Sequence, residues 1–337
     1  DFSMEIRPGE LVALVGESGS GKSITALSIL QLLPKEALLN GNIQFFDKET
    51  EKTLTLSDAT SKQLRRIRGE KISMVFQEPM TSLNPLMRCG DQIIEALKAH
   101  QKINSTQALK KTKEALLQAG IAFPENVINK YPHQLSGGQK QRIMIAMAIV
   151  CQPQLLIADE PTTALDVKVQ QEILQTLREL KDNTGIAILL ITHDLGIVAD
   201  VADRIIVMRK GKIVEEGPAR QILFHPQQEY TRTLLASRPA AHAKGVRLPQ
   251  ASDNSQTKQV IATKEETEKQ ISATSFLIAD QITVVRKQST AGRSIAVKTV
   301  DEVSFELRKN EITGLVGQSG CGKTTLGRAL LNLIPID

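Results

Sequence analysis

The stretch that decides the fold is GESGSGKS, from Gly16 to Ser23, and a second copy, GQSGCGKT, runs from Gly317 to Thr324. Both match the pattern G-x-x-x-x-G-K-[ST], in which glycines turn the backbone so that several N–H groups point at one phosphate chain. In the first copy Lys22 is placed to reach the β and γ phosphates, and the Ser23 hydroxyl to bind Mg²⁺. The sequence therefore predicts two nucleotide-phosphate loops.

The flanking residues support this prediction. Residues Glu10 to Val15 (ELVALV) suit a buried strand, Ile24 to Leu33 (ITALSILQLL) suit a helix, and the apolar run EITGLV before the second loop predicts a strand there as well. A helix that begins at the loop favours anions at its N-terminus. The predicted phosphate contacts are Gly16, Glu17, Ser18, Gly19, Ser20, Gly21, Lys22 and Ser23 in the first loop, and Gly317, Gln318, Ser319, Gly320, Cys321, Gly322, Lys323 and Thr324 in the second.

Composition bounds the class of protein. The 337 residues are enough for two domains, and 41% hydrophobic and 23% charged residues suit folded cores. A net charge of +5 fits either a solvated basic surface or a contact with nucleotide, nucleic acid or anionic lipid. Three cysteines without metal-ligand spacing indicate a reducing compartment. No apolar run reaches the length that spans a bilayer, so any membrane role is expected to run through a partner.

The order of segments predicts two homologous domains. Continuous apolar runs suit a parallel sheet buried on both faces, and the stretch from about Met80 to Gln134 reads as a helical insertion. The segment Asp1 to Pro34 can be laid over Asp301 to Pro335, which marks an internal repeat. We therefore expect a first domain over residues 1–237 without its N-terminal strand, a linker over 238–275, and the start of a second domain over 276–337. The sequence reads as a piece of a longer protein.

Four further elements follow the first loop in a fixed order, and together they identify a family. They are Gln77 in VFQEPMTSLNP, the pentapeptide LSGGQ with Ser136, Gly137, Gly138 and Gln139, the carboxylates Asp159 and Glu160 after the run LLIA, and His193 after ILLIT. Their order resembles the Walker A, Q-loop, signature, Walker B and switch histidine of the ATP-binding cassette family, over Asp1 to about Pro218. The resemblance implies an α/β P-loop NTPase fold: a mainly parallel core sheet, an antiparallel β subdomain and a helical insertion, with the second copy truncated after its loop.

The resemblance implies a role for each of these residues, and each role has a physical reason. Asp159 would bind Mg²⁺, usually through water, beside Ser23, with Gln77 as a further ligand and Thr324 as the counterpart in the second loop. Glu160 would act as general base on the attacking water. His193 would orient the γ-phosphate. Glu160 as a structural carboxylate and His193 as a structural histidine remain the alternatives. Lys22 would stabilise the charge that develops in phosphoryl transfer.

The signature has two interpretations. It offers Ser136 and two glycine N–H groups at the start of a helix, Lys140 to Val150, which is a second anion site; a helix cap is the alternative. In the resembled family the signature of one domain closes on the ATP held by another, with Asp166 helping the two faces communicate. The sequence contains two phosphate loops and one signature. A polypeptide of these residues is therefore expected to be nearly inactive unless two copies pair through their first domains.

The flanking residues are similar to the dipeptide/oligopeptide importer branch, and the fused domains to the ATPase subunits of glutathione and microcin C/peptide uptake systems. The similar segments are QEPMTSLNP (Gln77 to Pro85), YPHQLSGGQKQRIMIAMA (Tyr131 to Ala148), ADEPTTALDV (Ala158 to Val167) and HPQQEYTRTLLASRP (His225 to Pro239). The branch implies ATP and Mg²⁺, two membrane permease subunits, an extracytoplasmic solute-binding protein, and a peripheral place on the cytoplasmic face of the inner membrane. No nucleic-acid partner is expected. The alternative is a soluble tandem cassette protein that acts on ribosomes or DNA. The sequence does not identify the solute.

Overall fold

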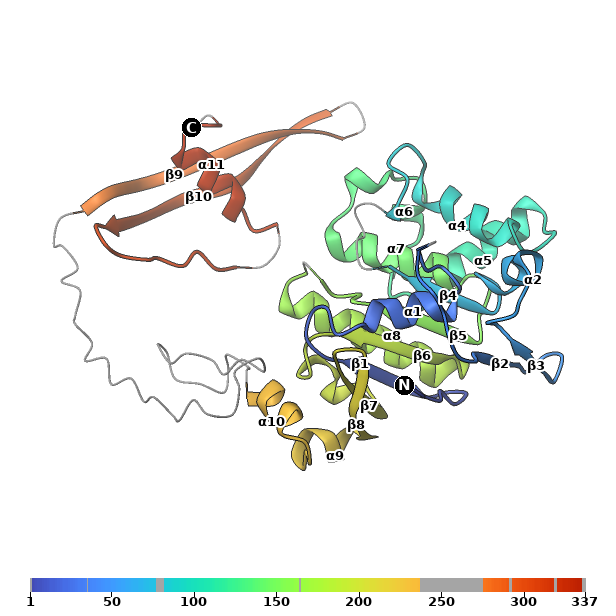
Figure 1. The fold of residues 1–337 in the computed structure, drawn as a ribbon. Helices are drawn as coiled ribbons and strands as arrows, with labels where there is room; N and C mark the ends of the chain where they lie inside the picture. Colours follow the sequence, from blue (N-terminus) through green and yellow to red (C-terminus); the bar gives the residue numbers. More distant parts are fainter. Residues whose placement is uncertain are drawn as a thin grey trace. The chain divides into compact units, whose positions relative to one another are not determined.

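The structure is a computed structural model that describes residues 2–34, 36–76, 82–163, 165–236, 275–290, 293–317 and 320–334. The chain divides into two compact units, Asp1–Asn254 and Ser255–Asp337 (Figure 1). The predicted linker, residues 238–275, falls almost wholly outside the described residues. The exact domain boundaries therefore stay a prediction, and each unit is described by itself.

The first unit is built on a six-stranded sheet with the order β4-β5-β6-β1-β7-β8. Every neighbouring pair from β4 to β7 is parallel, and β8 joins β7 antiparallel. This confirms the predicted α/β class with its mainly parallel core sheet. The strands are β1 (Leu11–Val15), β4 (Ile72–Val75), β5 (Leu155–Asp159), β6 (Ala187–Thr192), β7 (Arg204–Arg209) and β8 (Lys212–Pro218), and a separate antiparallel hairpin is formed by β2 (Gln44–Asp47) and β3 (Lys52–Thr55).

The central strand β1 shows why the apolar runs lie in the middle of the sheet. All five of its residues are fully buried. Successive side chains of a strand point to opposite faces, so Leu11, Ala13 and Val15 join one hydrophobic cluster, and Val12 and Leu14 join another. A strand that is apolar on both faces is stable only where both faces are covered. The run therefore fixes the position of the phosphate loop that follows it.

Helices cover both faces of the sheet. The cluster on one face includes buried residues of α4 (Cys89–Lys98), α5 (Ser105–Gln118), α7 (Gly137–Ile149), α8 (Val167–Thr184) and α9 (Ala219–Phe224), together with Tyr230 of α10 (Glu229–Ala236). The other face is covered by α1 (Lys22–Ile29), α2 (Ser61–Ile67) and the β2–β3 hairpin. Figure 1 shows α4, α5 and α7 clustered with the short α6 (Glu125–Ile128). Of this cluster, α4, α5 and α6 fall within the predicted helical insertion, and α7 follows it along the chain. Short 3₁₀ turns lie at Pro132–Gln134 (η1) and Ile197–Asp200 (η2).

Helix α1 ends earlier than the sequence pattern predicts. The apolar pattern continues to Leu33, but the helix stops at Ile29 because Gln31 adopts the left-handed conformation, with φ of 52°. The amide of Gln31 donates to Ser28 O at 3.0 Å, and that of Leu32 donates to Leu27 O at 2.8 Å. These bonds are typical of a helix C-terminus that closes on a left-handed residue.

The second unit is a long antiparallel hairpin, β9 (Ser275–Thr290) and β10 (Arg293–Arg308), with α11 (Lys323–Leu330) packed against it. The strand predicted from EITGLV is wrong, because residues 311–317 form no strand and Ile312 and Val316 are 101% and 88% exposed. In the first unit the equivalent strand β1 is held between β6 and β7. The described residues of the second unit contain no strands that correspond to these two, so the run has nothing to pair with.

Candidate active site

The first phosphate loop connects β1 to α1, and its glycines are required by close approach and by backbone conformation. A Cβ at Gly16 would lie 2.1 Å from the Met208 carbonyl oxygen of β7, which excludes any side chain there. Gly21 has φ of +104° and stands at the N-terminus of α1, where no side chain caps the helix. By contrast, Ser136 and Asp166 cap α7 and α8 through their side chains. The first amides of α1 are thus left for an anion.

Lys22 is folded back onto this loop. The residue is only 5% exposed, and Nζ donates to the carbonyl oxygens of Gly16 and Glu17 at 2.8 Å each. Burial lowers the pKa of Lys22, while the neighbouring carboxylates of Glu160, Asp159 and Glu17 act in the opposite direction. The lysine therefore brings a positive charge to the same place as the uncapped amides of α1.

Asp159 ends strand β5 and lies against the loop. Ser23 Oγ donates to Asp159 Oδ1 at 3.2 Å, and Asp159 is 5% exposed. Burial raises the pKa of Asp159, the Ser23 hydrogen bond lowers it, and the Glu160 charge raises it again, with a net upward shift. A buried carboxylate beside a hydroxyl is a pair of hard oxygen ligands of the kind that Mg²⁺ prefers. The described residues contain no group of three or more His, Cys, Asp or Glu side chains that could form a protein-only cage. The pair of oxygen ligands fits Mg²⁺ held jointly with substrate phosphates.

Glu160 follows β5 in a left-handed conformation, with φ of 46°. Its amide donates to Ile191 O of β6 at 2.9 Å, which fixes the backbone. Its two carboxylate oxygens have separate partners: Thr163 Oγ1 donates to Oε2 at 2.9 Å, and His193 Nδ1 lies 3.1 Å from Oε1. Burial raises the pKa of Glu160, but the contacts with His193 and Thr163 outweigh it and hold the pKa below its ordinary value. Glu160 is thus an ionised and oriented carboxylate.

The sheet order explains why residues far apart in sequence meet. Strands β5, β6 and β1 are neighbours, and their carboxyl ends lead into Asp159, His193 and the phosphate loop. In open parallel sheets, ligands bind at this edge. The His193 side chain is 61% exposed, so the group opens to solvent. The structure brings together Lys22, Ser23, Asp159, Glu160 and His193, as the sequence predicts.

The signature residues lie at the start of α7. Ser136 Oγ accepts from the Gln139 amide at 3.3 Å, and Gln139 Oε1 accepts from the Ser136 amide at 3.2 Å, which is a capping box. Ser136, Gly137 and Gln139 are exposed, and Gly138 lies close to Val169 of α8. The signature glycines lie beside Val169 of α8 and Leu165, whereas the phosphate loop lies against β5 and β7. The helix-cap interpretation is therefore satisfied, and the exposed Gly137 beside the cap is left for a further role.

Some predicted site residues are not placed together. Gln77 lies outside the described residues, as do Gln318 and Ser319 of the second loop. In that loop Lys323 Nζ donates to Gly317 O at 2.6 Å and lies 3.7 Å from Cys321 Sγ, so the lysine folds back as Lys22 does. Gly322, like Gly21, has a φ near 100°, at 99°, and starts α11 without a side-chain cap. Gly320 and Cys321 lie in the turn before α11, and Thr324 is the second residue of that helix, but the described residues supply no counterpart of Asp159 there.

One contact to the phosphate loop was not expected from the sequence. The hydroxyl of Tyr230, on α10, accepts a hydrogen bond from the Glu17 amide at 3.3 Å. Tyr230 lies within HPQQEYTRTLLASRP, so the resemblance of that segment to the importer branch was the available signal.

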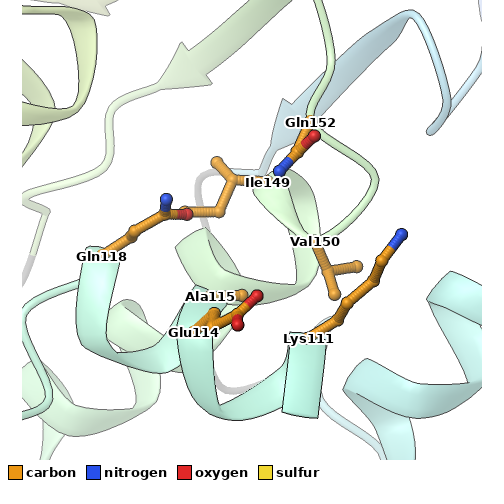
Figure 2. Close-up of a pocket in the computed structure, with 7 residues that line it drawn as sticks. All are labelled: Lys111, Glu114, Ala115, Gln118, Ile149, Val150 and Gln152. Carbon is orange, nitrogen blue, oxygen red and sulfur yellow. The ribbon is translucent and has the colours of Figure 1, made fainter. Parts of the chain in front are cut away.

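A small hollow between α5 and the end of α7 has a volume of about 20 Å³, enough for about one water molecule and far too small for a nucleotide (Figure 2). It is lined by Lys111, Glu114, Ala115, Gln118, Ile149, Val150 and Gln152.

This loop, at the edge of a parallel sheet and beside a buried aspartate, is that of the P-loop nucleotide-binding proteins. The family model described as ABC transporter matches residues 1–163 and 300–337. The chain belongs to the ABC transporter family, and its fold is that of the ABC ATPases.

Similar proteins include the peptidoglycan transport ATP-binding protein YejF of Agrobacterium fabrum, with 50% identity over 98% of this chain and 56% of that protein. The glutathione import ATP-binding protein GsiA of Escherichia coli is 40% identical over 99% of this chain and 55% of that protein. The chain thus spans little more than half the length of these relatives. The dimeric structure of MJ0796, a bacterial ABC transporter cassette, has a TM-score of 0.56 and 31% identity over 65% of this chain and 90% of that one. A post-hydrolysis state of the same cassette with ADP and Pi has a TM-score of 0.55 and 30% identity. In the described residues, no helix is both long and apolar enough to cross a membrane.

Proposed function

We propose that this chain binds and hydrolyses ATP to drive an importer of peptides or related solutes. The observation that carries the proposal is the meeting of Lys22, Ser23, Asp159 and Glu160 at the carboxyl edge of the sheet. Lys22 favours phosphates, Ser23 and Asp159 favour Mg²⁺, and Glu160 is an ionised base. This combination suits phosphoryl transfer to water, in which binding and electrostatics supply most of the catalysis.

Each residue has a distinct task in the proposed reaction. The uncapped amides of α1 and Lys22 bind the β and γ phosphates and neutralise their charge. Ser23 and Asp159 would hold Mg²⁺, which neutralises and orients the phosphate oxygens when it is bound. Glu160 accepts a proton at a carboxylate oxygen from the water that attacks the γ-phosphorus. Thr163 fixes one oxygen of Glu160, and His193 orients the other from the solvent side. Gln77 stays a proposed further ligand.

The signature is proposed to act on a nucleotide held by another domain. Gly137 is exposed and Gly138 is half-buried at the start of α7, next to a capping box that already satisfies Ser136 and Gln139. The similar cassette MJ0796 is a dimer, which supports pairing of cassettes. In the chain described here, the second loop of Gly317 to Thr324 is proposed to bind ATP as well, with Thr324 as its Mg²⁺ ligand.

The relatives favour transport over the alternative role on ribosomes or DNA. Their names describe peptidoglycan transport and glutathione import ATP-binding proteins. We infer that the partners are two membrane permease subunits and an extracytoplasmic solute-binding protein, with the chain peripheral on the cytoplasmic face of the inner membrane. Co-purification with permease subunits would support this role. Co-purification with ribosomes in their place would contradict it.

The ATPase proposal is tested by phosphate release from ATP with Mg²⁺, for the wild-type chain and for Lys22→Ala. Lys22→Ala removes the ammonium that lies against the Gly16 and Glu17 carbonyl oxygens of the first loop, so ATP binding and turnover are expected to fall at least a hundredfold. Lys62→Ala is the matched control, because Lys62 is an exposed lysine of α2. Equal activity of Lys22→Ala and Lys62→Ala would refute the proposed site. Specific activity is also expected to rise with protein concentration, because two first units must pair.

A further inference from the structure

One peptide group of the phosphate loop is held at both ends. The Gly16 carbonyl oxygen accepts from Lys22 Nζ at 2.8 Å. The Glu17 amide of the same peptide group donates to the hydroxyl of Tyr230 at 3.3 Å. The Lys22 ammonium and the Tyr230 hydroxyl therefore restrain the rotation of this peptide from opposite sides. The Lys22 restraint comes from within the loop, whereas the Tyr230 restraint is not local, since Tyr230 lies 213 residues from Glu17.

Tyr230 is itself held firmly. It is 6% exposed, and Arg209 of β7 lies over its ring, with the guanidinium carbon 4.7 Å from the ring centroid. A buried tyrosine hydroxyl needs a hydrogen-bond partner, and here the Glu17 amide is that partner. The contact is therefore part of how the helix packs and not an incidental meeting of surface groups.

The segment before Tyr230 is anchored to the sheet. The carboxylate of Glu215, on β8, accepts from the amides of Gln227 and Gln228 at 2.7 and 3.2 Å. Arg232 donates to the carbonyl oxygens of Pro226 and Gln227 at 3.0 and 2.8 Å. These bonds fix the turn that leads into α10 and so fix the position of Tyr230 relative to β7 and β8.

We propose that Tyr230 is a positioning residue for the phosphate loop: through the Glu17 amide it keeps the Gly16–Glu17 peptide in the orientation that anchors Lys22. The inference rests on the proposed function, in which Lys22 binds the phosphates of ATP. Tyr230 acts through the loop and touches no substrate. Its effect is therefore expected on nucleotide affinity and on the mobility of the loop, and not on the chemical step.

The test compares the wild-type chain with Tyr230→Phe, which removes the hydroxyl but keeps the ring under Arg209. Loss of one neutral hydrogen bond at the long end of the normal distance range is expected to weaken ATP binding about two- to tenfold, with kcat unchanged within about twofold. Thr233→Ala is the matched control, because it also removes a hydroxyl from α10, but one that donates within the helix to Glu229 O. ATP affinity is expected to be unchanged in this control.

Hydrogen exchange of the nucleotide-free protein gives a readout that does not depend on ATP. The Glu17 amide is expected to exchange at least threefold faster in Tyr230→Phe than in the wild type, and not in Thr233→Ala. Unchanged Glu17 exchange together with unchanged ATP affinity in Tyr230→Phe would overturn the inference. A wild-type chain that binds no ATP, with faster Glu17 exchange in Tyr230→Phe, would overturn the proposed function while leaving the restraint on the loop in place. If Tyr230→Phe and Thr233→Ala lost kcat and ATP affinity to the same extent, α10 would act only through the stability of the fold, and the inference would be overturned.

Discussion

The two glycines of the signature can be separated by substitution, because they meet different neighbours. A Cβ at Gly138 would lie 2.6 Å from Val169 Cγ1 on α8, while a Cβ at Gly137 would lie 3.2 Å from Leu165 Cδ2. Val169 is β-branched and stiff, whereas a leucine methyl can move by a few tenths of an ångström. Both glycines stand in the first turn of α7, where alanine retains the backbone N–H.

The magnitudes follow from these contacts. Replacing a helical glycine by alanine stabilises by about 0.5–1 kcal/mol, and overpacking costs about 1–3 kcal/mol. Gly138→Ala is therefore expected to lower the free energy of unfolding by about 0.5–2 kcal/mol, whereas Gly137→Ala is expected to be neutral or to raise it slightly. The assay is urea unfolding of the nucleotide-free chain followed by circular dichroism.

A double-mutant cycle checks the cause. Adding Val169→Ala to Gly138→Ala opens the space that the new Cβ needs, so the coupling energy is expected to be about 0.5–2 kcal/mol in the favourable direction. Equal stability of Gly138→Ala and Gly137→Ala, or no coupling with Val169→Ala, would refute the packing argument. ATP turnover then separates the two interpretations of the signature. At least a tenfold loss in the stable Gly137→Ala supports a nucleotide contact, and full activity would leave LSGGQ as a helix cap only.

Two further predictions use the titratable groups. Burial raises the pKa of Asp159, so the folded state binds this proton more tightly than the unfolded chain does, and ionised Asp159 costs stability above its ordinary pKa of 3.8. Asp159→Asn is expected to raise the urea midpoint of the nucleotide-free chain at pH 7. The difference in midpoint between the variant and the wild type is expected to shrink as the pH falls through the raised pKa. A lower midpoint for the variant at pH 7 would contradict this. Burial raises the pKa of Cys89 and Cys151 to about 11, while Cys321 is exposed. One thiol is therefore expected to react quickly with Ellman's reagent at pH 7.5 and two only after denaturation, and three fast thiols would show that the core is open.

Much of the first unit could be predicted because its signals are local. The glycine pattern of the loop at Gly16 to Ser23 sets its backbone conformation. The apolar runs before Asp159 and His193 are parallel strands in neighbouring positions of the sheet. Parallel strands place their carboxyl ends at one edge of the sheet. Asp159 and His193 each follow such a strand, so both are expected at the same edge as the phosphate loop. The capping box at Ser136 was likewise readable from the spacing of Ser136 and Gln139.

The remainder depends on contacts that the sequence pattern does not reveal. The run EITGLV has the pattern of a strand, but a strand needs neighbours, and the described second unit offers none beside it. The end of α1 depends on Gln31 adopting a left-handed conformation within an apolar helical pattern. The hydrogen bond from the Glu17 amide to the Tyr230 hydroxyl joins residues 213 positions apart, so no local sequence pattern predicts it.

The most direct test of the site is the comparison of ATP binding and ATP hydrolysis in Glu160→Gln. Glutamine keeps the shape of the side chain but cannot take the proton, so hydrolysis is expected to fall about 10²- to 10⁴-fold while ATP still binds with wild-type stoichiometry and traps a dimer on gel filtration. If Glu160→Gln hydrolyses ATP at a rate within tenfold of the wild type, or fails to bind ATP and to form the dimer, then Glu160 is not the general base.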